Sequence, residues 1–337
     1  MLEKYKENDK RLLEQIKNIL PNKIFDAHIH LYDASFMSNY YERGGAFNRK
    51  RVTFGDYLID NKMLLEDNFI TRANILMLPD LYMDKSSRKE FKEKSLKFLM
   101  QELDRNPLNV GEVAVFPEYS IEDVELLLVH PNIIGFKCYH TTSDKKPTFN
   151  ATINEYLPES VWQVANEREM CITLHMVRDK SLSDENNFRY ITTMCHKYPK
   201  AKLILAHCAR GFASWTTVEK VEELVDYENV WFDLSAVCES PAIFQIVNKT
   251  GIKRTVWGSD YPISMIYGKA ISLSDTFYWI DDEDLCSFSK KTGVVGNSVL
   301  IESLLAVKQA ICMLELDTSQ IEDIFYNNAI RLFNIID

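Results

Sequence analysis

Apolar and polar positions alternate along the chain in blocks of two kinds. Short apolar runs that are typical of buried β-strands cover residues 23–31, 70–78, 110–116, 133–139, 170–176, 202–207, 230–234 and 254–259. Between them lie longer stretches with the period of a helix, such as the charged stretch 85–103 and the stretch that opens with the capping-box pattern Ser120-Ile-Glu-Asp123. Eight strand–helix units favour a closed (β/α)8 TIM barrel, an α/β fold, over an open sheet.

Three segments lie outside this alternation. Residues 2–20 predict an amphipathic helix that ends at Pro21 and packs on the outside or the bottom of the barrel. Residues 32–60 predict a long loop above the first strand, and residues 263–300 predict an irregular insertion after the eighth. The pattern Ser319-Gln-Ile-Glu322 predicts a second capping box before a helix over 324–335. We therefore expect a single domain over residues 1–337, with an N-terminal helix within 1–21 and the insertion at 263–300.

Composition and charge narrow the partners of such a barrel. The 337 residues are 46% hydrophobic and 26% charged, which is ordinary for a globular protein with a large core. The formal net charge is -10 and no long basic cluster is present, so nucleic acid and anionic membrane surfaces are poor candidates for partners. We expect a small-molecule substrate, and an anionic one would need local arginines. The sequence leaves open whether the chain forms a homo-oligomer.

The cellular compartment is suggested by what the sequence lacks. The opening residues are charged and have no apolar segment of a secretory signal, and no apolar run is long enough to span a bilayer. The seven cysteines are scattered without a Cys-x-x-Cys pair. Buried free thiols in a reducing compartment account for them most simply, so we expect a cytoplasmic protein.

The first strand carries the most informative residues, His28 and His30. Side chains two residues apart in a strand point to the same face, so these imidazoles are expected side by side, with Asp26 on the same face. Either histidine alone is better explained as a core residue satisfied by hydrogen bonds. The pair at this spacing favours two metal ligands.

Four other strand runs carry an ionisable residue at or near their carboxyl ends: Lys137, His175, His207 and Asp260. In a barrel this is the face on which active sites form. Each residue alone fits a structural role, but together with the histidines of the first strand they predict a metal site. Such a set of nitrogen and oxygen ligands suits zinc, and also manganese or iron, better than calcium or magnesium. Asp260 is able both to ligate the metal and to accept a proton from its bound water.

The chain resembles the amidohydrolase superfamily, in particular its amidohydrolase-2 branch. The resemblance rests on motifs spread over nearly the whole barrel: Phe25-Asp-Ala-His-Ile-His30, Gly135-Phe-Lys137, Thr173-Leu-His175, Leu205-Ala-His207, Trp257-Gly-Ser-Asp-Tyr-Pro262 and Asn327-Asn-Ala-Ile-Arg-Leu-Phe333. It implies a metal-dependent barrel enzyme. The branch includes hydrolases of amides and lactones, nonoxidative decarboxylases and hydratases, and the fold does not choose among these reactions.

The resemblance also implies roles for individual residues. His28 and His30 from strand 1, His175 from strand 5 and Asp260 from strand 8 match the metal-ligand positions. His207 matches a position that either ligates a second metal or orients water or substrate. Lys137 matches a position at which some superfamily members carry a carboxylated lysine between two metals, and it is otherwise expected to contact the substrate. Because the branch often works with one metal, we expect about one per chain.

Two arginines suggest the charge of the substrate. Arg178 and Arg210 each lie three residues after a proposed site histidine, at the carboxyl ends of neighbouring strands. Such a pair is able to reach one pocket and bind a carboxylate, because the guanidinium fork matches it with two hydrogen bonds. Either arginine alone is equally well explained by a surface salt bridge. Of the remaining histidines, His130 and His196 are expected to be structural or surface groups, and the role of His140 stays open.

Together these observations predict a metal-dependent hydrolase in which metal-activated water cleaves an amide or lactone bond of a small carboxylated substrate. The catalytic residues are expected to be Asp260 and His207. Decarboxylation of an unsaturated or aromatic acid at the same site is the alternative reaction. A catalytically silent metal-binding homologue is the alternative from another class, although no ligand position has been lost.

Overall fold

The structure of the protein is a computed structural model that describes residues 2–37, 49–62, 69–80, 83 and 85–336. Eight strands form one sheet in the order β1-β4-β5-β6-β7-β8-β9-β10, and neighbouring strands are parallel. Their bounds are β1 (Lys23–Ile29), β4 (Phe69–Leu76), β5 (Val110–Ala114), β6 (Ile133–Tyr139), β7 (Cys171–His175), β8 (Lys202–Leu205), β9 (Val230–Asp233) and β10 (Thr255–Val256). Each observed strand overlaps its predicted run, so the TIM barrel is confirmed.

The barrel closes between β1 and the chain that follows β10. The Ala27 N–H donates to the Trp257 carbonyl at 3.0 Å, and the Asp260 N–H donates to the His28 carbonyl at 2.8 Å. Gly258 lies between these two bonds, and a Cβ atom on it would come within 2.6 Å of the His28 Cβ and 3.0 Å of the His28 nitrogen. Any side chain here would push the two segments apart, so this close approach requires glycine.

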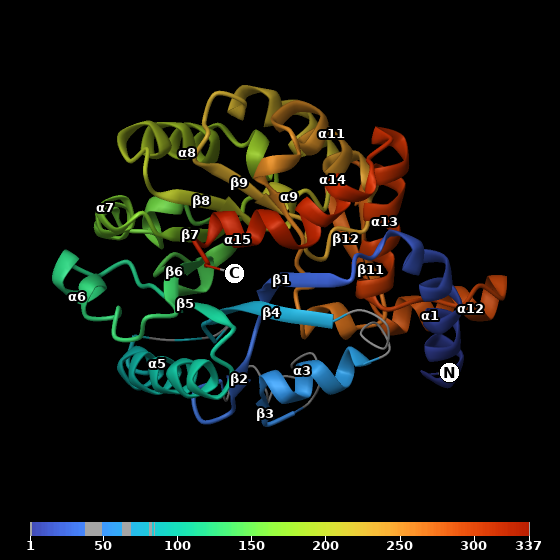
Figure 1. Cartoon of the computed structure of the whole chain (residues 1–337), viewed down its shortest axis with the longest axis horizontal. Helices are drawn as coiled ribbons and strands as arrows, with labels where there is room; N and C mark the ends of the chain where they lie inside the picture. The colour runs from blue at the N-terminus through green and yellow to red at the C-terminus, as the bar shows by residue number, and fades with distance from the viewer. Residues whose placement is uncertain (1, 38–48, 63–68, 81–82, 84, 337) are drawn as a thin grey trace.

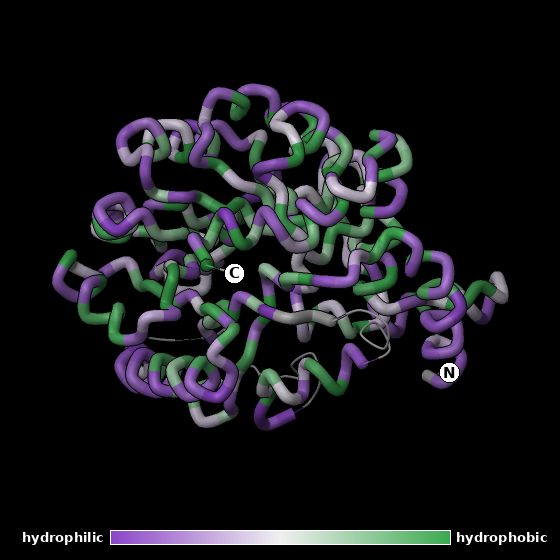
Figure 2. The backbone as a smooth tube through the Cα atoms, viewed as in Figure 1, coloured by the Kyte–Doolittle hydropathy of each residue, from purple (hydrophilic) through white to green (hydrophobic). Residues whose placement is uncertain are grey.

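Helices surround the barrel (Figure 1). Their bounds are α1 (Leu2–Ile16), α3 (Phe54–Asp60), α5 (Arg88–Arg105), α6 (Ile121–Glu125), α7 (Glu159–Arg168), α8 (Glu185–Lys197), α10 (Ser214–Lys220), α11 (Ser240–Thr250), α12 (Asp282–Thr292), α13 (Val299–Leu314), α14 (Thr318–Glu322) and α15 (Asn328–Leu332). Helix α1 packs against α13 on the outside of the barrel, as predicted. In Figure 2 the outer helices α1 and α5 are largely hydrophilic, as expected of helices with one face in water. None of the described helices is long and apolar enough to cross a membrane.

The amino end of the barrel is filled with apolar side chains and closed by the C-terminal helix. Buried residues near the starts of the strands, including Phe25, Val110 and Val256, pack with Leu332 and Phe333 at the end of α15. The rings of Phe25 and Phe333 are 5.4 Å apart. Because this end is packed with apolar groups, polar chemistry is left to the opposite, carboxyl end of the strands.

The insertion predicted over 263–300 follows the eighth strand as expected, but the prediction that it is irregular is wrong. Strands β11 (Lys269–Leu273) and β12 (Thr276–Ile280) form an antiparallel hairpin, and α12 follows it. The sequence carried the signal, because two strand-like runs flank the short turn Ser274-Asp275. Ser274 adopts a left-handed φ of 54° in that turn.

Three smaller predictions have mixed outcomes. The capping box from Ser120 to Asp123 is present at the start of α6. The later capping box uses Asp317 and Gln320 at the start of α14, so the predicted one at Ser319 is wrong. The loop predicted for 32–60 contains the short strands β2 (Tyr32–Asp33) and β3 (Arg51–Val52) as well as α3, and its residues 38–48 lie outside the described part of the chain.

All seven cysteines lie in the described part of the chain and are free thiols. Five of them are buried, Cys286 is half-buried and Cys312 is exposed. The prediction of buried free thiols therefore holds for most of them.

Candidate metal centre

His28 and His30 converge at the carboxyl end of β1, where their Nε2 atoms are 3.1 Å apart. The other ring nitrogen of each is bonded to a group that only accepts hydrogen bonds. His30 Nδ1 lies 2.9 Å from the Leu76 carbonyl oxygen, and His28 Nδ1 is bonded to the Asp233 carboxylate. Both protons are therefore assigned to Nδ1, which leaves a lone pair on each Nε2.

Asp260 supplies a third acceptor to this pair. Its Oδ1 lies 3.4 Å from His28 Nε2 and 3.3 Å from His30 Nε2. The three acceptors share no proton with one another, an arrangement that a cation stabilises, and the Lys137 Nζ already lies 3.5 Å from one of them, His28 Nε2. Two ligands that each bind zinc at about 2.1 Å, at angles between octahedral and tetrahedral, lie about 3.0–3.5 Å apart. The three donor atoms therefore fit one divalent metal, and they form one of the two His/Asp groups of this kind among the described residues.

Asp260 is held in an unusual backbone conformation. Its φ is 62°, in the left-handed region that aspartate tolerates better than most residues. Burial alone would raise its pKa, but the nearby imidazoles of His207 and His30 outweigh burial and keep the pKa of Asp260 below its ordinary value. The residue is therefore a carboxylate. No donor among the described residues bonds to its second oxygen, Oδ2.

The prediction that Asp26 shares the face of the two histidines is wrong. The pairing register between β1 and β4 shifts between Asp26 and Ile29, which marks a bulge in β1. The Asp26 carboxylate instead accepts hydrogen bonds from the Tyr57 hydroxyl of α3 at 2.9 Å and from the Ser259 N–H at 2.8 Å. It thereby ties α3 and the loop after β10 to the strand that carries the histidines.

Asp233, at the end of β9, fixes the orientation of His28. One carboxylate oxygen accepts from His28 Nδ1, and the other accepts from the Ser235 N–H at 2.6 Å. Burial would raise the pKa of Asp233, but its interactions with His28 outweigh that effect and lower the pKa. Burial and the charge of Lys137 lower the pKa of His28, so its ring stays neutral, as a metal ligand must be.

His175 and His207 form a second chain of hydrogen bonds beside this centre. The Arg210 Nη1 donates to His175 Nε2 at 3.3 Å, so the His175 proton lies on Nδ1, which is 3.2 Å from His207 Nε2. His207 Nδ1 in turn lies 3.1 Å from the Ser235 carbonyl oxygen. Both nitrogens of His175 are thus engaged with protein groups, and it belongs to neither His/Asp group that fits a metal. Its role as a ligand stays a prediction.

A left-handed turn places His207 and Arg210 together. Residues 207–210 all have φ between 54° and 60°, in the segment labelled α9 (Ala206–Arg210). Each non-glycine residue in this conformation costs about 1–2 kcal/mol. The turn brings the side chains of its first and last residues onto the same histidine, His175, from two sides. Strain of this kind is characteristic of functional sites.

Lys137 lies behind the ligands rather than in the open part of the site. Its Nζ is 3.5 Å from His28 Nε2, and the side chain is fully buried. Burial lowers the pKa of Lys137, and burial raises the pKa of neighbouring Glu112 to about 7. One Glu112 oxygen accepts from Asn74 and Thr173, each at 2.8 Å. These polar groups separate the histidines from the apolar end of the barrel.

A pocket of about 400 Å³ opens onto the centre, a volume in the range of small-molecule sites. Its lining consists of His30, Leu78, Tyr139, His140, Phe149, His175, His207, Arg210, Phe212, Asp260, Ile263, Phe277 and Trp279. The ionisable residues come from the strand ends. Most of the remaining wall is aromatic, and Phe277 and Trp279 are contributed by β12 of the hairpin.

Arg210 lines this pocket, as predicted. Arg178 does not line it. Arg178 Nε donates to the Asp184 carboxylate at 2.9 Å, so it forms the surface salt bridge that was the alternative interpretation. Arg210 Nη1 donates to His175 and to the Met176 carbonyl at 3.4 Å, and its Nε is buried without a partner. No described carboxylate pairs with Arg210. A buried guanidinium that forms no direct ion pair favours an anionic ligand.

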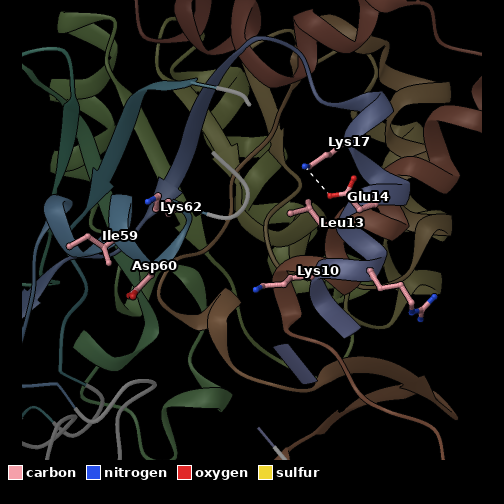
Figure 3. Close-up of a pocket in the computed structure, with 8 residues that line it drawn as sticks. Lys10, Leu13, Glu14, Lys17, Ile59, Asp60 and Lys62 are labelled. Carbon is pink, nitrogen blue, oxygen red and sulfur yellow. Dashed lines mark ion pairs between the residues drawn. The ribbon is translucent and has the colours of Figure 1, made fainter. Parts of the chain in front are cut away.

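A second, more open cavity of about 630 Å³ lies away from these residues (Figure 3). Side chains from residues 10–17 line one side of it and side chains from residues 59–62 line the other. Glu14 and Lys17 form an ion pair at 2.9 Å within it. The cavity contains none of the candidate ligands, so we place the chemistry at the centre formed by His28, His30 and Asp260.

Comparison with known proteins agrees with this geometry. A family model described as amidohydrolase matches residues 25–335. The chain belongs to the amidohydrolase family. No curated protein matches this amidohydrolase.

Solved structures share its barrel. The 5-carboxyvanillate decarboxylase from Sphingomonas paucimobilis is 12% identical with a TM-score of 0.60, covering 94% of this chain and 100% of that one. An amidohydrolase from Burkholderia multivorans with bound zinc is 10% identical with a TM-score of 0.60, covering 93% and 99%. A putative 2-pyrone-4,6-dicarboxylic acid hydrolase from Pseudomonas putida is 13% identical with a TM-score of 0.55, covering 94% and 100%. These similarities show the shared fold.

Sequence reasoning missed two parts of the site. Asp233 ends the apolar run Val-Trp-Phe-Asp, the same signal that identified His207, and was overlooked. The hairpin aromatics Phe277 and Trp279 were missed because their segment was interpreted as irregular. A pattern of alternating residues on both sides of Ser274 was the available signal.

Proposed function

We propose that this amidohydrolase is a metal-dependent hydrolase that cleaves an amide or lactone bond of a small carboxylated substrate. The observation that carries the proposal is the convergence of three ligand-type atoms, His28 Nε2, His30 Nε2 and Asp260 Oδ1, which lie 3.1–3.4 Å apart. A bound divalent metal, with zinc as first choice, would supply a Lewis acid and lower the pKa of a water molecule. The zinc in the related Burkholderia multivorans structure supports this choice.

Asp260 is proposed as the general base. Its Oδ1 faces the histidines, its Oδ2 makes no hydrogen bond with described residues, and it lines the pocket. In hydrolysis Oδ2 accepts the proton of the attacking water, a contribution of typically about 10²–10⁴-fold. His207, fixed by Ser235 and His175, is proposed to orient the water or the scissile group.

Arg210 is proposed to bind the substrate carboxylate. A protein of net charge -10 repels anions at long range, so a fixed local cation is needed to hold one. Arg210 supplies that cation in the pocket wall. His175 lies between Arg210 and the candidate metal ligands. A carboxylate bound to Arg210 would therefore leave another part of the substrate free to reach Asp260.

The aromatic lining supports one second candidate, decarboxylation of an unsaturated or aromatic acid. The pocket presents Tyr139, Phe149, Phe212, Phe277 and Trp279, which suit a planar substrate. The Sphingomonas paucimobilis decarboxylase has the same fold.

A substrate panel separates the two reactions. The zinc-loaded protein is offered N-acyl amino acids, lactone carboxylates and aromatic acids, and acid release and CO₂ release are followed in parallel. Hydrolysis that is abolished in Asp260→Asn supports the proposal. Release of CO₂ without any hydrolysis contradicts it in favour of decarboxylation, and inactivity toward every class despite bound metal favours the silent homologue.

A further inference from the structure

His140 lines the substrate pocket, but the proposed hydrolysis gives it no task. It follows β6 directly, at the start of the single helical turn η2 (His140–Thr142), and is 2% exposed. Its ring centroid lies 4.7 Å from that of Phe149 and 4.9 Å from that of Tyr139. The imidazole is thus held between two aromatic rings of the pocket wall.

The two nitrogens of the His140 ring have different surroundings. Nδ1 lies 2.9 Å from the Thr148 hydroxyl oxygen, and no described residue bonds to Nε2. The Thr148 hydroxyl makes no other side-chain hydrogen bond within the described ranges, so it is free to donate to Nδ1. A threonine hydroxyl is able either to donate or to accept, so the tautomer with the His140 proton on Nε2 is part of the inference that follows. Burial and the charge of Arg210 lower the pKa of His140 to about 3 against an opposing hydrogen bond with the Thr148 backbone, so the ring is neutral at physiological pH.

His140 and Arg210 border the same ring, that of Phe149. The Arg210 guanidinium carbon lies 5.8 Å from the Phe149 centroid, and the His140 ring centroid lies 4.7 Å from it with the two rings tilted by 39°. Arg210 Nε has no acceptor among the described residues, and His140 Nε2 has no hydrogen-bond partner among them. Arg210 forms no ion pair with a described carboxylate, and Asp179 acts on its charge only from a distance. An anion with two acceptor oxygens, such as a carboxylate, would satisfy an N–H of Arg210 and an N–H of His140 together.

We propose that His140 is a substrate-recognition residue whose Nε2 proton is donated to the substrate carboxylate alongside the Arg210 guanidinium, and that Thr148 positions it. This inference rests on the proposed function, because it names the group that holds the carboxylate of the proposed substrate. The surrounding rings of Phe149, Phe277 and Trp279 make a planar unsaturated or aromatic group the natural carrier of that carboxylate.

The test is calorimetric binding of benzoate to the full-length, zinc-loaded protein, with benzamide as a neutral ligand of the same shape. Two substitutions separate the ring nitrogens: His140→Gln keeps an amide nitrogen where Nε2 lies, and His140→Asn keeps one only where Nδ1 lies. The matched control is His196→Asn, which alters an exposed histidine at the end of α8.

We expect wild-type protein and His196→Asn to bind benzoate equally and to bind benzamide at least 10-fold more weakly. His140→Asn should lose about 10-fold or more in benzoate affinity, because a hydrogen bond to a charged group is lost, while His140→Gln stays within about 3-fold. Thr148→Val should weaken benzoate binding and leave benzamide binding unchanged, an effect that a merely structural role would not produce.

The proposal is overturned if wild-type protein does not bind benzoate, if His140→Asn binds it as tightly as wild type, or if His140→Gln loses as much as His140→Asn. Zinc content measured on the same samples keeps this result apart from the proposed function. Metal-loaded protein that does not bind benzoate refutes the role of His140 and does not affect the assignment of the metal centre. Metal-free protein that shows the expected binding pattern supports His140 and refutes the metal-dependent hydrolase.

Discussion

Replacing Asp233 by asparagine should weaken metal binding without removing a ligand. In the structure one Asp233 oxygen accepts from the Ser235 N–H at 2.6 Å, and the other accepts from His28 Nδ1. In the variant the amide oxygen would stay on the Ser235 N–H, because only an acceptor satisfies that donor. The amide NH₂ would then face His28 Nδ1 and donate to it. His28 would have to carry its proton on Nε2, the atom proposed to bind the metal.

The expected size of this effect follows from the loss of the ligand tautomer. Removing a carboxylate that orients a metal-binding histidine typically costs about 10–100-fold in affinity, or about 1.4–2.7 kcal/mol. The assay is competition for zinc against a chromophoric chelator at pH 7.5. The matched control is Asp9→Asn, since Asp9 is also a buried aspartate that accepts from a serine N–H, that of Ser298, at 3.0 Å.

The control should retain the zinc affinity of wild-type protein, because Asp9 lies in α1 on the outside of the barrel. An Asp233→Asn protein that is folded and binds zinc within about 2-fold of wild type would refute the assignment of the His28 proton. The same result would remove the main reason for assigning a lone pair, and not a proton, to His28 Nε2.

Three further predictions address the base, the anion site and pH. Asp260→Asn, which the left-handed backbone tolerates, should retain most zinc but lose about 10²–10⁴-fold in turnover, and near wild-type turnover would contradict its role as base. Arg210→Lys should raise the KM of the true substrate at unchanged metal content; an unchanged KM would argue against an anionic substrate. Burial raises the pKa of Asp9 from 3.8 to about 6, so the folded state binds its proton more tightly than the unfolded state, and wild-type stability should fall as pH rises from 4 to 6. The difference in the free energy of unfolding in urea, Asp9→Asn minus wild type, should be about 1–3 kcal/mol more favourable to the variant at pH 7 than at pH 4. An equal difference at both pH values would contradict the raised pKa of Asp9.

The barrel could be predicted from the sequence because its strands are buried on both faces. Continuous apolar runs such as Cys171–His175 and Lys202–Leu205 stand out from the polar helices that separate them, and the observed strands overlap all eight runs. The hairpin β11–β12 did not stand out, because both strands lie on the surface and mix polar with apolar residues. Such short exposed strands depend on the rest of the fold for their stability.

The site was predicted in part, since strand periodicity reports the face of a residue but not its backbone irregularities. His28 and His30 converge as their spacing predicts, whereas the bulge in β1 removes Asp26 from their face. The left-handed turn over residues 207–210 contains no glycine, so its composition did not predict the turn. The contact of both His207 and Arg210 with His175 could therefore not be predicted either.

The interaction partners of the two arginines could also not be predicted from the sequence. Arg178 and Arg210 occupy equivalent positions after their strands, yet the first pairs with the aspartate that caps α8 and the second turns into the pocket. Only the positions of these neighbours in space decide between a salt bridge and a substrate contact.

The central claim is that His28, His30 and Asp260 hold one divalent metal, and elemental analysis of protein saturated with zinc and then gel-filtered tests it most directly. We expect about one zinc per wild-type chain and less than about a tenth of that in a folded His30→Ala variant, because two donor atoms are too few to retain the ion. Folded wild-type protein that emerges without metal, or a His30→Ala protein that keeps a full equivalent, would contradict the claim.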